Sequence, residues 1–222
     1  MFVKIKGVLF DLDGTLINTT PLILECFRLT FKEMGLPVPS DSELVAGFGL
    51  PLLTAVKAYM PEEMAEEFCT RYRKYNVAHH DEWIQPFEGI NESLAALAER
   101  GIKMAVVTSK KRPMALRGLG FYGLEKYFSA VVTCTDCAEH KPLPGPSLMA
   151  LQQLGLSGAE CIGVGDSPFD LQSARVAGCH TAAVRYTSFD WDYILSEGKP
   201  DYVLNKMEDL VRLIDKINKQ ED

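Results

Sequence analysis

The sequence lacks any apolar run long enough to cross a membrane. No stretch approaches the roughly 20 uninterrupted apolar residues that a membrane helix needs. Lys4 and Lys6 also place charges where a signal peptide would have its apolar segment. We therefore expect a soluble cytoplasmic protein that has no membrane partner.

Basic charge is scarce as well. The 222-residue chain has 23 Lys and Arg against 30 Asp and Glu, which gives a formal net charge of −7. Because nucleic-acid binding rests on neutralising phosphates with Lys and Arg, an acidic chain without basic clusters is a poor candidate for it. The same argument applies to anionic membrane surfaces. We predict that no nucleic acid is among the partners of this protein.

Cysteines are few and scattered. Six in a chain of this length do not form the pattern of a disulfide framework. Cys134 and Cys137 have C-x-x-C spacing, but a zinc site with His140 would need a fourth ligand, and a redox site would need a thioredoxin-like βαβ start. We interpret this segment as a loop with two free thiols.

What the sequence does have is enough apolar material for a core. Hydrophobic residues make up 47% of the chain and charged residues 24%, both ordinary for a globular protein. The length corresponds to about one and a half average domains. These values favour one core with an insertion, or one large α/β domain.

Short apolar runs alternate with segments of helical spacing. The first run, residues 3–12, has the pattern of a strand buried on both faces. Further strands are expected at Ile102–Thr108, Ala130–Thr133, Cys161–Val164, Thr181–Val184 and Tyr202–Leu204. Helices are expected at Ile90–Arg100, Ser147–Leu154, Leu171–Ala177 and Met207–Ile217. This alternation predicts βαβ units and a parallel sheet.

The first two strands are unusually far apart. About ninety residues separate them, far more than a crossover helix requires. Residues 15–86 contain several helical stretches, one of them over residues 62–79, and no strand-like alternation. We therefore predict an all-helical insertion that follows the first strand and forms a cap on a split α/β core.

Two acids stand where the first strand ends. Asp11 and Asp13 are two residues apart, and Gly14-Thr15 follows them. Two close carboxylates after an apolar strand repel each other unless a cation or a proton offsets the repulsion. A turn that caps the strand is the alternative. The carboxyl edge of a parallel sheet is also where α/β folds bind ligands.

Hydroxyl and lysine side chains follow the next strands. Thr108 and Ser109 stand where a strand ends and backbone amides begin a helix, an arrangement that holds anions but is also common in helix caps. Lys141 lies before proline-rich sequence after the strand near residue 130. A lysine fixed there suits a phosphoryl oxygen, although a lysine in this setting can also be simply solvated.

A second pair of acids follows the strand near residue 161. Asp166 comes at the end of that strand, and Asp170 lies four residues later, where it could also cap a helix. Oxygen ligands that converge from several loops are what Mg²⁺ prefers. The acids, hydroxyls and lysine follow successive strands, so we expect them to meet at one edge of the sheet.

This ordered set resembles the four motifs of the haloacid dehalogenase superfamily of phosphotransferases. The resemblance implies a Rossmann-like, doubly wound parallel sheet, with a catalytic core of residues 1–15 and 86–222 and a helical cap of residues 16–85. It also implies a Mg²⁺-dependent phosphatase that acts on a small phosphorylated metabolite. Asp13 disfavours dehalogenation, because the dehalogenases of the superfamily lack this second acid.

The resemblance also implies roles for individual residues. Asp11 would be the nucleophile that forms an aspartyl-phosphate, and Asp13 the general acid and base. Thr108 and Lys141 would hold the phosphoryl oxygens. The metal ligands would be Asp11, the backbone carbonyl of Asp13, and Asp166. Asp170 would be an outer-shell residue that positions Lys141 or a ligand water.

The substrate is expected to contact the cap. Gly47 and Gly49 lie in a loop that resembles the cap loop of phosphoglycolate phosphatases, and we place them, with Ser109, among the substrate-binding residues. Residues 72–82 and the region around residues 199–207 look like the bacterial pyrophosphatase branch. Arg73 or Lys74 could offset the charge of pyrophosphate, but neither is placed in the site. Pyrophosphate and phosphoglycolate are the leading candidates.

Three other functions remain open. A sugar phosphomutase would use the same core, although it usually has an arginine near the cap loop, where this chain has none. A phospho-receiver domain also gathers acids, a hydroxyl and a lysine, but it has no helical insertion after the first strand. A catalytically silent binding protein would use the groove under the cap. A monomer and a homodimer are both compatible with the sequence.

Overall fold

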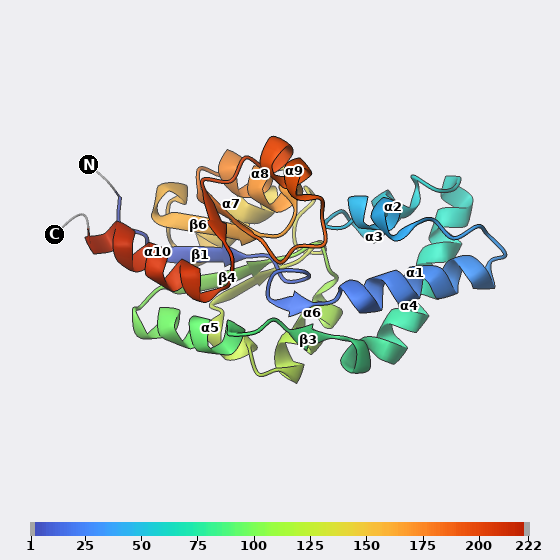
Figure 1. Ribbon diagram of the computed structural model, residues 1–222, viewed down its shortest axis with the longest axis horizontal. Helices are drawn as coiled ribbons and strands as arrows, with labels where there is room; N and C mark the ends of the chain where they lie inside the picture. Colours follow the sequence, from blue (N-terminus) through green and yellow to red (C-terminus); the bar gives the residue numbers. More distant parts are fainter. Residues whose placement is uncertain (1–2, 220–222) are drawn as a thin grey trace.

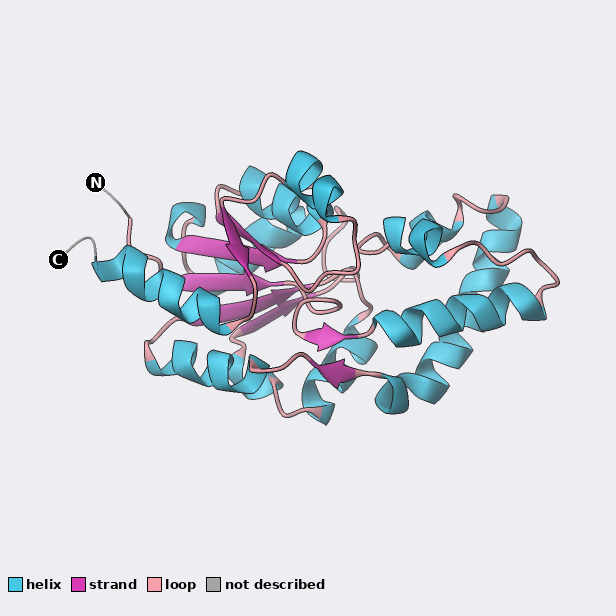
Figure 2. Ribbon diagram, in the orientation of Figure 1, coloured by secondary structure: helices cyan, strands magenta, loops and turns pink. Residues whose placement is uncertain are grey.

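The fold is built on a six-stranded parallel sheet with helices on both faces (Figures 1 and 2). The structure is a computed structural model, and it describes residues 3–219. Along the sheet the strand order is β5-β4-β1-β6-β7-β8, and every neighbouring pair is parallel. The strands are β1 (Gly7–Phe10), β4 (Lys103–Val107), β5 (Ala130–Val132), β6 (Cys161–Gly165), β7 (His180–Val184) and β8 (Tyr202–Leu204).

The strand order reverses beside β1, at the centre of the sheet. From β1 the chain moves outward through β4 and β5, then returns to the other side of β1 and continues through β6, β7 and β8. All four residues of β1 are buried, as expected for a strand covered on both faces. In such sheets the ligand crevice opens at the carboxyl ends of the strands where the order reverses. The predicted doubly wound parallel sheet is confirmed.

Helices cover both faces of this sheet. In Figure 1, α5 and α10 lie below it, while α7 and α8 lie above it and pack on β4 to β7. The α-helices are α5 (Ile90–Glu99), α6 (Arg112–Phe121), α7 (Gly145–Leu154), α8 (Pro168–Val176), α9 (Trp191–Tyr193) and α10 (Glu208–Lys219). Short helical turns are η1 (Glu125–Tyr127), η2 (Gly158–Glu160) and η3 (Ile194–Gly198).

Four helices between the first two strands of the sheet form a separate bundle at one end of the molecule (Figure 1). They are α1 (Thr20–Glu33), α2 (Asp41–Ala46), α3 (Leu52–Val56) and α4 (Glu62–Trp83), and we call them the cap helices. Their packing is aromatic: α1 and α4 lie together, and the rings of Phe31 and Phe68 are 4.7 Å apart. Phe27 contacts both Phe68 and Tyr72. Apolar burial of this kind stabilises a small bundle.

A short pair of strands lies at the two boundaries of the predicted helical insertion. Ile17–Asn18 (β2) pairs antiparallel with Gln85–Pro86 (β3). A strand of two residues is too short to show an alternating pattern, so this pair could not be recognised in the sequence. This pair lies where the chain enters and leaves the cap helices.

The first strand of the sheet is shorter than expected. It covers residues 7–10 instead of 3–12. Val3, Lys4 and Lys6 are exposed, whereas Ile5 is buried, so burial on both faces begins only at Gly7.

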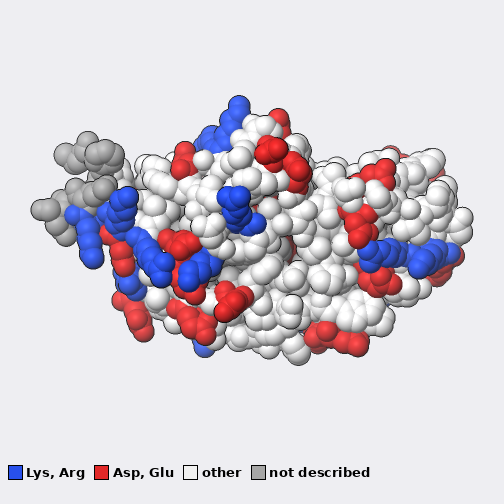
Figure 3. All heavy atoms as spheres, in the orientation of Figure 1, with Lys and Arg blue, Asp and Glu red and all other residues white. Residues whose placement is uncertain are grey.

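Charges of both signs are spread over the face drawn in Figure 3. Basic and acidic side chains lie next to one another there, and no broad field of one sign covers that face. Among residues 3–219, no helix has both the length and the apolar character that a membrane span requires.

Candidate active site

Lys141 and Asp11 form the centre of the site, at the carboxyl ends of the central strands. Asp11 follows β1, and its backbone N–H donates to the carbonyl of Val164 on β6 at 2.9 Å. The Lys141 Nζ donates to Asp11 Oδ1 at 2.7 Å and to Asp170 Oδ1 at 2.5 Å, and also to the carbonyl of Val107 at 3.1 Å. All three charged side chains are buried. The ammonium group is therefore fixed by three acceptors.

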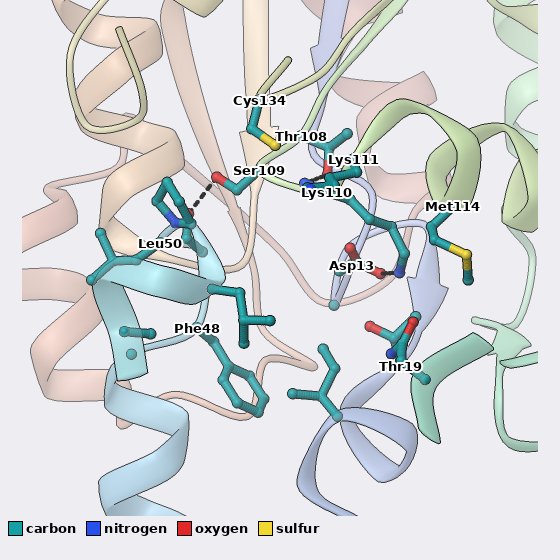
Figure 4. Close-up of a pocket in the computed structure, with 18 of the residues that line it drawn as sticks. Asp13, Thr19, Phe48, Leu50, Thr108, Ser109, Lys110, Lys111, Met114 and Cys134 are labelled. Atoms are coloured by element: carbon teal, nitrogen blue, oxygen red, sulfur yellow. Dashed lines mark hydrogen bonds and ion pairs between the residues drawn. The ribbon is translucent and has the colours of Figure 1, made fainter. Parts of the chain in front are cut away.

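The turn after Asp11 requires glycine. Gly14 has φ +88°, and a Cβ at this residue would lie 2.3 Å from Asp166 Oδ2. Only glycine combines the left-handed backbone with this close approach. The turn places Asp13 on the wall of the cavity, where its Oδ1 accepts a hydrogen bond from Lys110 Nζ at 2.6 Å (Figure 4).

Asp170 has two structural roles. Its Oδ2 accepts hydrogen bonds from the backbone N–H and the hydroxyl of Ser167, which forms a capping box at the start of α8. Its Oδ1 accepts from Lys141. Asp170 therefore caps a helix and also holds the lysine, and the sequence had allowed both roles.

Asp166 is the residue after β6. The glycine-rich end of this strand places Asp166 next to the turn at Gly14.

Burial and the charges of neighbouring residues change the pKa values of the side chains in this cluster. Burial raises the pKa of Asp11 to about 7; Lys141 opposes this shift, while Asp170 and Asp13 add to it. Burial, with Asp170 and Asp11, also raises the pKa of Asp166 well above its usual value. Burial alone would lower the pKa of Lys141, but Asp11 and Asp170 outweigh it and raise this pKa. The lysine therefore stays charged.

The acidic cluster fits a divalent cation. Carboxylate oxygens of Asp11, Asp166 and Asp170 lie within 4.8 Å of one another, and all three residues are buried. Lys141 supplies one positive charge against these three carboxyl groups. The raised pKa values of Asp11 and Asp166 reflect burial first and the repulsion among the acids second. Hard oxygen ligands in this arrangement suit Mg²⁺, and a cation there would relieve the repulsion.

A cavity of about 400 Å³ opens over this cluster, between the sheet edge and the cap helices. Asp11, Asp13, Thr108 and Asp166 line the side formed by the sheet edge. The cap side is largely apolar, and its lining includes Ile23, Phe27, Phe48, Leu50, Leu52, Leu53, Tyr72 and Val77. A mostly apolar pocket with a few convergent polar groups is typical of a small-molecule site.

The loop between α2 and α3 touches the sheet edge directly. Ser109 Oγ donates to the carbonyl of Gly49 at 2.5 Å, as Figure 4 shows near Leu50. A Cβ on Gly49, which has φ +84°, would lie 2.9 Å from Ser167 Oγ. Gly47 also lines the cavity. The three residues predicted to bind substrate therefore lie at the junction of cap and core, and Ser109 and Gly49 bind each other.

Most of the lining residues were not placed in the site from the sequence, and four polar ones among them are of interest. Lys110 pairs with Asp13, while Lys111, Arg73 and Asn76 also line the cavity. The two lysines directly follow Thr108-Ser109, so their position after a strand was a signal that could have been used. On α4, Asn76 follows Arg73 by three residues and Tyr72 by four, so Asn76 is a neighbour of both on the helix surface. The sequence does not show which face of the helix meets the cavity.

Cys134 and Cys137 are both free thiols, as predicted. Cys134 lines the cavity, and burial raises the pKa of its thiol. A raised pKa keeps the sulfur in its less reactive protonated form.

The sheet topology and the acidic, lysine-bearing edge are those of an α/β protein that binds its ligand at the carboxyl ends of its strands. The sequence model of the haloacid dehalogenase-like hydrolases matches residues 8–184. The chain belongs to this family, as its motifs indicated.

Relatives with known names agree with this assignment. The chain is 40% identical to a pyrophosphatase PpaX of Halalkalibacterium halodurans over 211 residues, which cover 95% of this chain and 97% of the relative. It is 39% identical to a pyrophosphatase PpaX of Bacillus cereus strain AH820 over 216 residues, which cover 97% and 99% of the two chains.

Solved structures show the same fold. A haloacid dehalogenase-like family hydrolase from Streptococcus pneumoniae superposes with a TM-score of 0.85 at 26% identity and covers 94% of this chain and 98% of its own. A predicted phosphoglycolate phosphatase from Haemophilus somnus 129PT gives a TM-score of 0.86 at 24% identity and covers 96% and 99%. These superpositions cover nearly the whole chain, so they include the helical insertion. With the family match and the named relatives, the protein is a hydrolase of the phosphatase type.

Proposed function

We propose that this protein is a cytoplasmic, Mg²⁺-dependent phosphatase that cleaves a small phosphorylated metabolite through an aspartyl-phosphate at Asp11. The observation that carries this proposal is the buried cluster in which Lys141 joins Asp11 and Asp170. Two acids of this cluster, Asp11 and Asp166, line the cavity. The core would comprise residues 1–15 and 86–222, and the cap residues 16–85.

In the first step, a carboxylate oxygen of Asp11 attacks the phosphorus atom of the substrate. The new bond joins Asp11 to phosphorus as the bond from phosphorus to the leaving oxygen breaks. Asp13, on the same wall of the cavity, gives its proton to the leaving oxygen. The products of this step are the aspartyl-phosphate and the protonated leaving group.

In the second step, water releases the phosphate. Asp13, now a carboxylate, takes a proton from the water as its oxygen attacks phosphorus. The bond between phosphorus and Asp11 breaks, which restores the Asp11 carboxylate and yields inorganic phosphate. Asp13 is again protonated, so the cycle closes without any co-reactant.

Other residues stabilise the charge that moves through these steps. Lys141 is held beside the Asp11 carboxylate and would meet a phosphoryl oxygen there, as would the hydroxyl of Thr108. Asp11, Asp166 and the backbone carbonyl of Asp13 would hold Mg²⁺, which supplies a fixed positive charge that neutralises phosphoryl oxygens. Asp170 would act through Lys141 by keeping its ammonium group in place.

The cap helices would close over the bound substrate. The chain crosses between core and cap only through the segments that contain β2 and β3, so we assign the hinge to this pair of strands. In the closed form, the Gly49 carbonyl accepts a hydrogen bond from Ser109 Oγ, and the loop that contains Gly49 covers the cavity. Closure of this kind excludes water from a reactive acyl phosphate.

Pyrophosphate is the first candidate substrate. Two relatives that align with this chain over nearly their whole length are named pyrophosphatases, while a structural neighbour is named a predicted phosphoglycolate phosphatase. A sugar phosphomutase remains a second possibility for the same core, and dependence on a bisphosphorylated sugar would reveal it.

The direct test is phosphate release with Mg²⁺ from a panel of pyrophosphate, phosphoglycolate, sugar phosphates and nucleotides. We expect turnover that is highest with pyrophosphate and that falls on the order of 10⁴-fold or more in Asp11→Asn. A preference for phosphoglycolate would change the substrate and leave the mechanism intact. Absence of release from every substrate would refute the phosphatase proposal in favour of a receiver or a binding protein.

A further inference from the structure

Two basic side chains line the cavity without an ion-pair partner. Arg73 lies on α4, and Lys111 immediately precedes α6. Within residues 3–219, neither side chain makes a hydrogen bond or a salt bridge, whereas the neighbouring Lys110 is paired with Asp13. Uncompensated cations on the wall of one cavity attract an anion.

Arg73, from the cap, and Lys111, from the core, act electrostatically on the same region of the cavity. Burial raises the pKa of the thiols of Cys69, on α4, and Cys134, after β5, and Arg73 and Lys111 each oppose both shifts. Both residues line the one cavity where cap and core meet, Arg73 from α4 and Lys111 from the segment before α6. Figure 4 shows Lys111 on the wall that also carries Ser109 and Cys134.

The geometry of displacement directs the leaving group to this side. In an in-line reaction, the nucleophile and the leaving oxygen lie on opposite sides of phosphorus. Asp11 is on the floor of the cavity, at the end of β1, so the leaving group must point away from the sheet edge and toward the cap helices. Among the cap residues that the structure describes in the cavity lining, Arg73 is the one that carries a charge.

We propose that Arg73 and Lys111 form a subsite for a second anionic group, carried by the leaving group of the substrate. This inference rests on the proposed phosphatase function and names its substrate class: a phosphorylated compound whose leaving group is itself negatively charged, as in pyrophosphate or a phosphorylated carboxylate. One cation belongs to the cap and the other to the core, so the bound anion also draws the cap onto the core. A neutral leaving group gains neither effect.

The test compares two substrates in matched variants. The leaving group of pyrophosphate carries a second anionic group, whereas the leaving group of phenyl phosphate does not. The kcat/KM for pyrophosphate divided by the kcat/KM for phenyl phosphate therefore isolates the contribution of the subsite. We expect this ratio to fall about 10- to 100-fold in Arg73→Met, since an ion-paired hydrogen bond of this type contributes about 1.5–3 kcal/mol. Lys111→Met lowers it less, because Lys111 is more exposed.

Lys74→Met is the matched control. Lys74 is next to Arg73 on α4, but it is exposed and does not line the cavity, so its removal takes away the same charge without touching the subsite. We expect the ratio in this variant to equal that of the wild type. An equal ratio in Arg73→Met and the wild type, or the same fall in Lys74→Met, would overturn the subsite.

A binding measurement separates recognition from chemistry. Titration calorimetry with methylenediphosphonate and with methylphosphonate reports the affinity for a second anionic group without any hydrolysis. We expect Arg73→Met to weaken methylenediphosphonate binding at least tenfold more than methylphosphonate binding, and equal weakening would contradict the proposal. If the wild type releases no phosphate from any substrate, the phosphatase function fails; if it does release phosphate and the variants leave the ratio unchanged, only the subsite fails.

Discussion

The two walls of the cavity are built on different principles. On the sheet edge, the charged side chains next to Asp11 are held by partners: Lys141 joins Asp11 and Asp170, and Lys110 holds Asp13. Lys111, farther along the same wall, is the exception. On the cap side, the lining is mostly apolar, and Arg73 has no ion-pair partner among residues 3–219. Preorganised charges are most effective where bonds form and break. In the function that we propose, the sheet edge carries out the reaction and the cap distinguishes among substrates.

The two walls of the cavity also differ in where their residues lie along the sequence. Residues of the sheet edge come from distant segments that the parallel strands bring together, as in the contact of Asp11 with Lys141. The cap lining comes from the continuous stretch between β2 and β3. A change in the cap can therefore alter specificity while the sheet edge keeps its geometry.

Removal of the metal is expected to have the largest effect on the sheet edge. A chelator should abolish phosphate release, and added Mg²⁺ should restore it. Asp166→Asn should lower turnover about 10³-fold and also abolish the increase in Tm that Mg²⁺ gives to the wild type, because a cation that binds only the folded state stabilises it.

Asp192→Asn is the control for this change, since Asp192 is an exposed acid on α9 and does not line the cavity. It should keep both the turnover and the Mg²⁺-dependent increase in Tm. An Asp166→Asn protein that still gains stability with Mg²⁺ would show that the cation binds elsewhere.

Loss of the buried lysine should affect stability and turnover together. Lys141→Met leaves Asp11 and Asp170 buried without their shared cation, which we expect to lower the free energy of unfolding by about 3–5 kcal/mol. Urea unfolding measures this change, and turnover should fall by about 10²-fold or more. Mg²⁺ should recover part of the stability because it offsets the same repulsion. Unchanged stability would show that the lysine does not hold the cluster together.

Disturbing the cap loop should have the smallest effect. Gly49→Ala adds a methyl group 2.9 Å from Ser167 Oγ, at a residue with φ +84°, so the loop must move away from the sheet edge. We expect kcat/KM to fall about tenfold, equivalent to ~1.4 kcal/mol, through hindered cap closure. Gly35→Ala carries the same left-handed strain (φ +66°) with nothing within 4 Å. A similar loss of kcat/KM in both variants would attribute the effect to strain alone.

The sequence predicted the sheet edge better than the cap. Asp11, Thr108, Lys141 and Asp166 each follow an apolar run, and parallel strands bring such positions to one edge. The orientation of Arg73 depends on how α4 docks on the core, which helical spacing alone does not determine. The pairing of Lys110 with Asp13 depends on the turn at Gly14, where the two side chains meet. The β2–β3 pair was missed because two residues carry no periodic signal.

The most direct test of the account asks whether Asp11 becomes phosphorylated. The enzyme is mixed with Mg²⁺ and substrate, quenched in acid, and treated with borohydride, which reduces an acyl phosphate to an alcohol. Peptide mass spectrometry should then find homoserine in place of Asp11, and only in the sample that received substrate. Asp11→Asn should give no such product. An enzyme that turns over substrate without this product, or that carries it at another carboxylate, would contradict the assignment of Asp11 as the nucleophile.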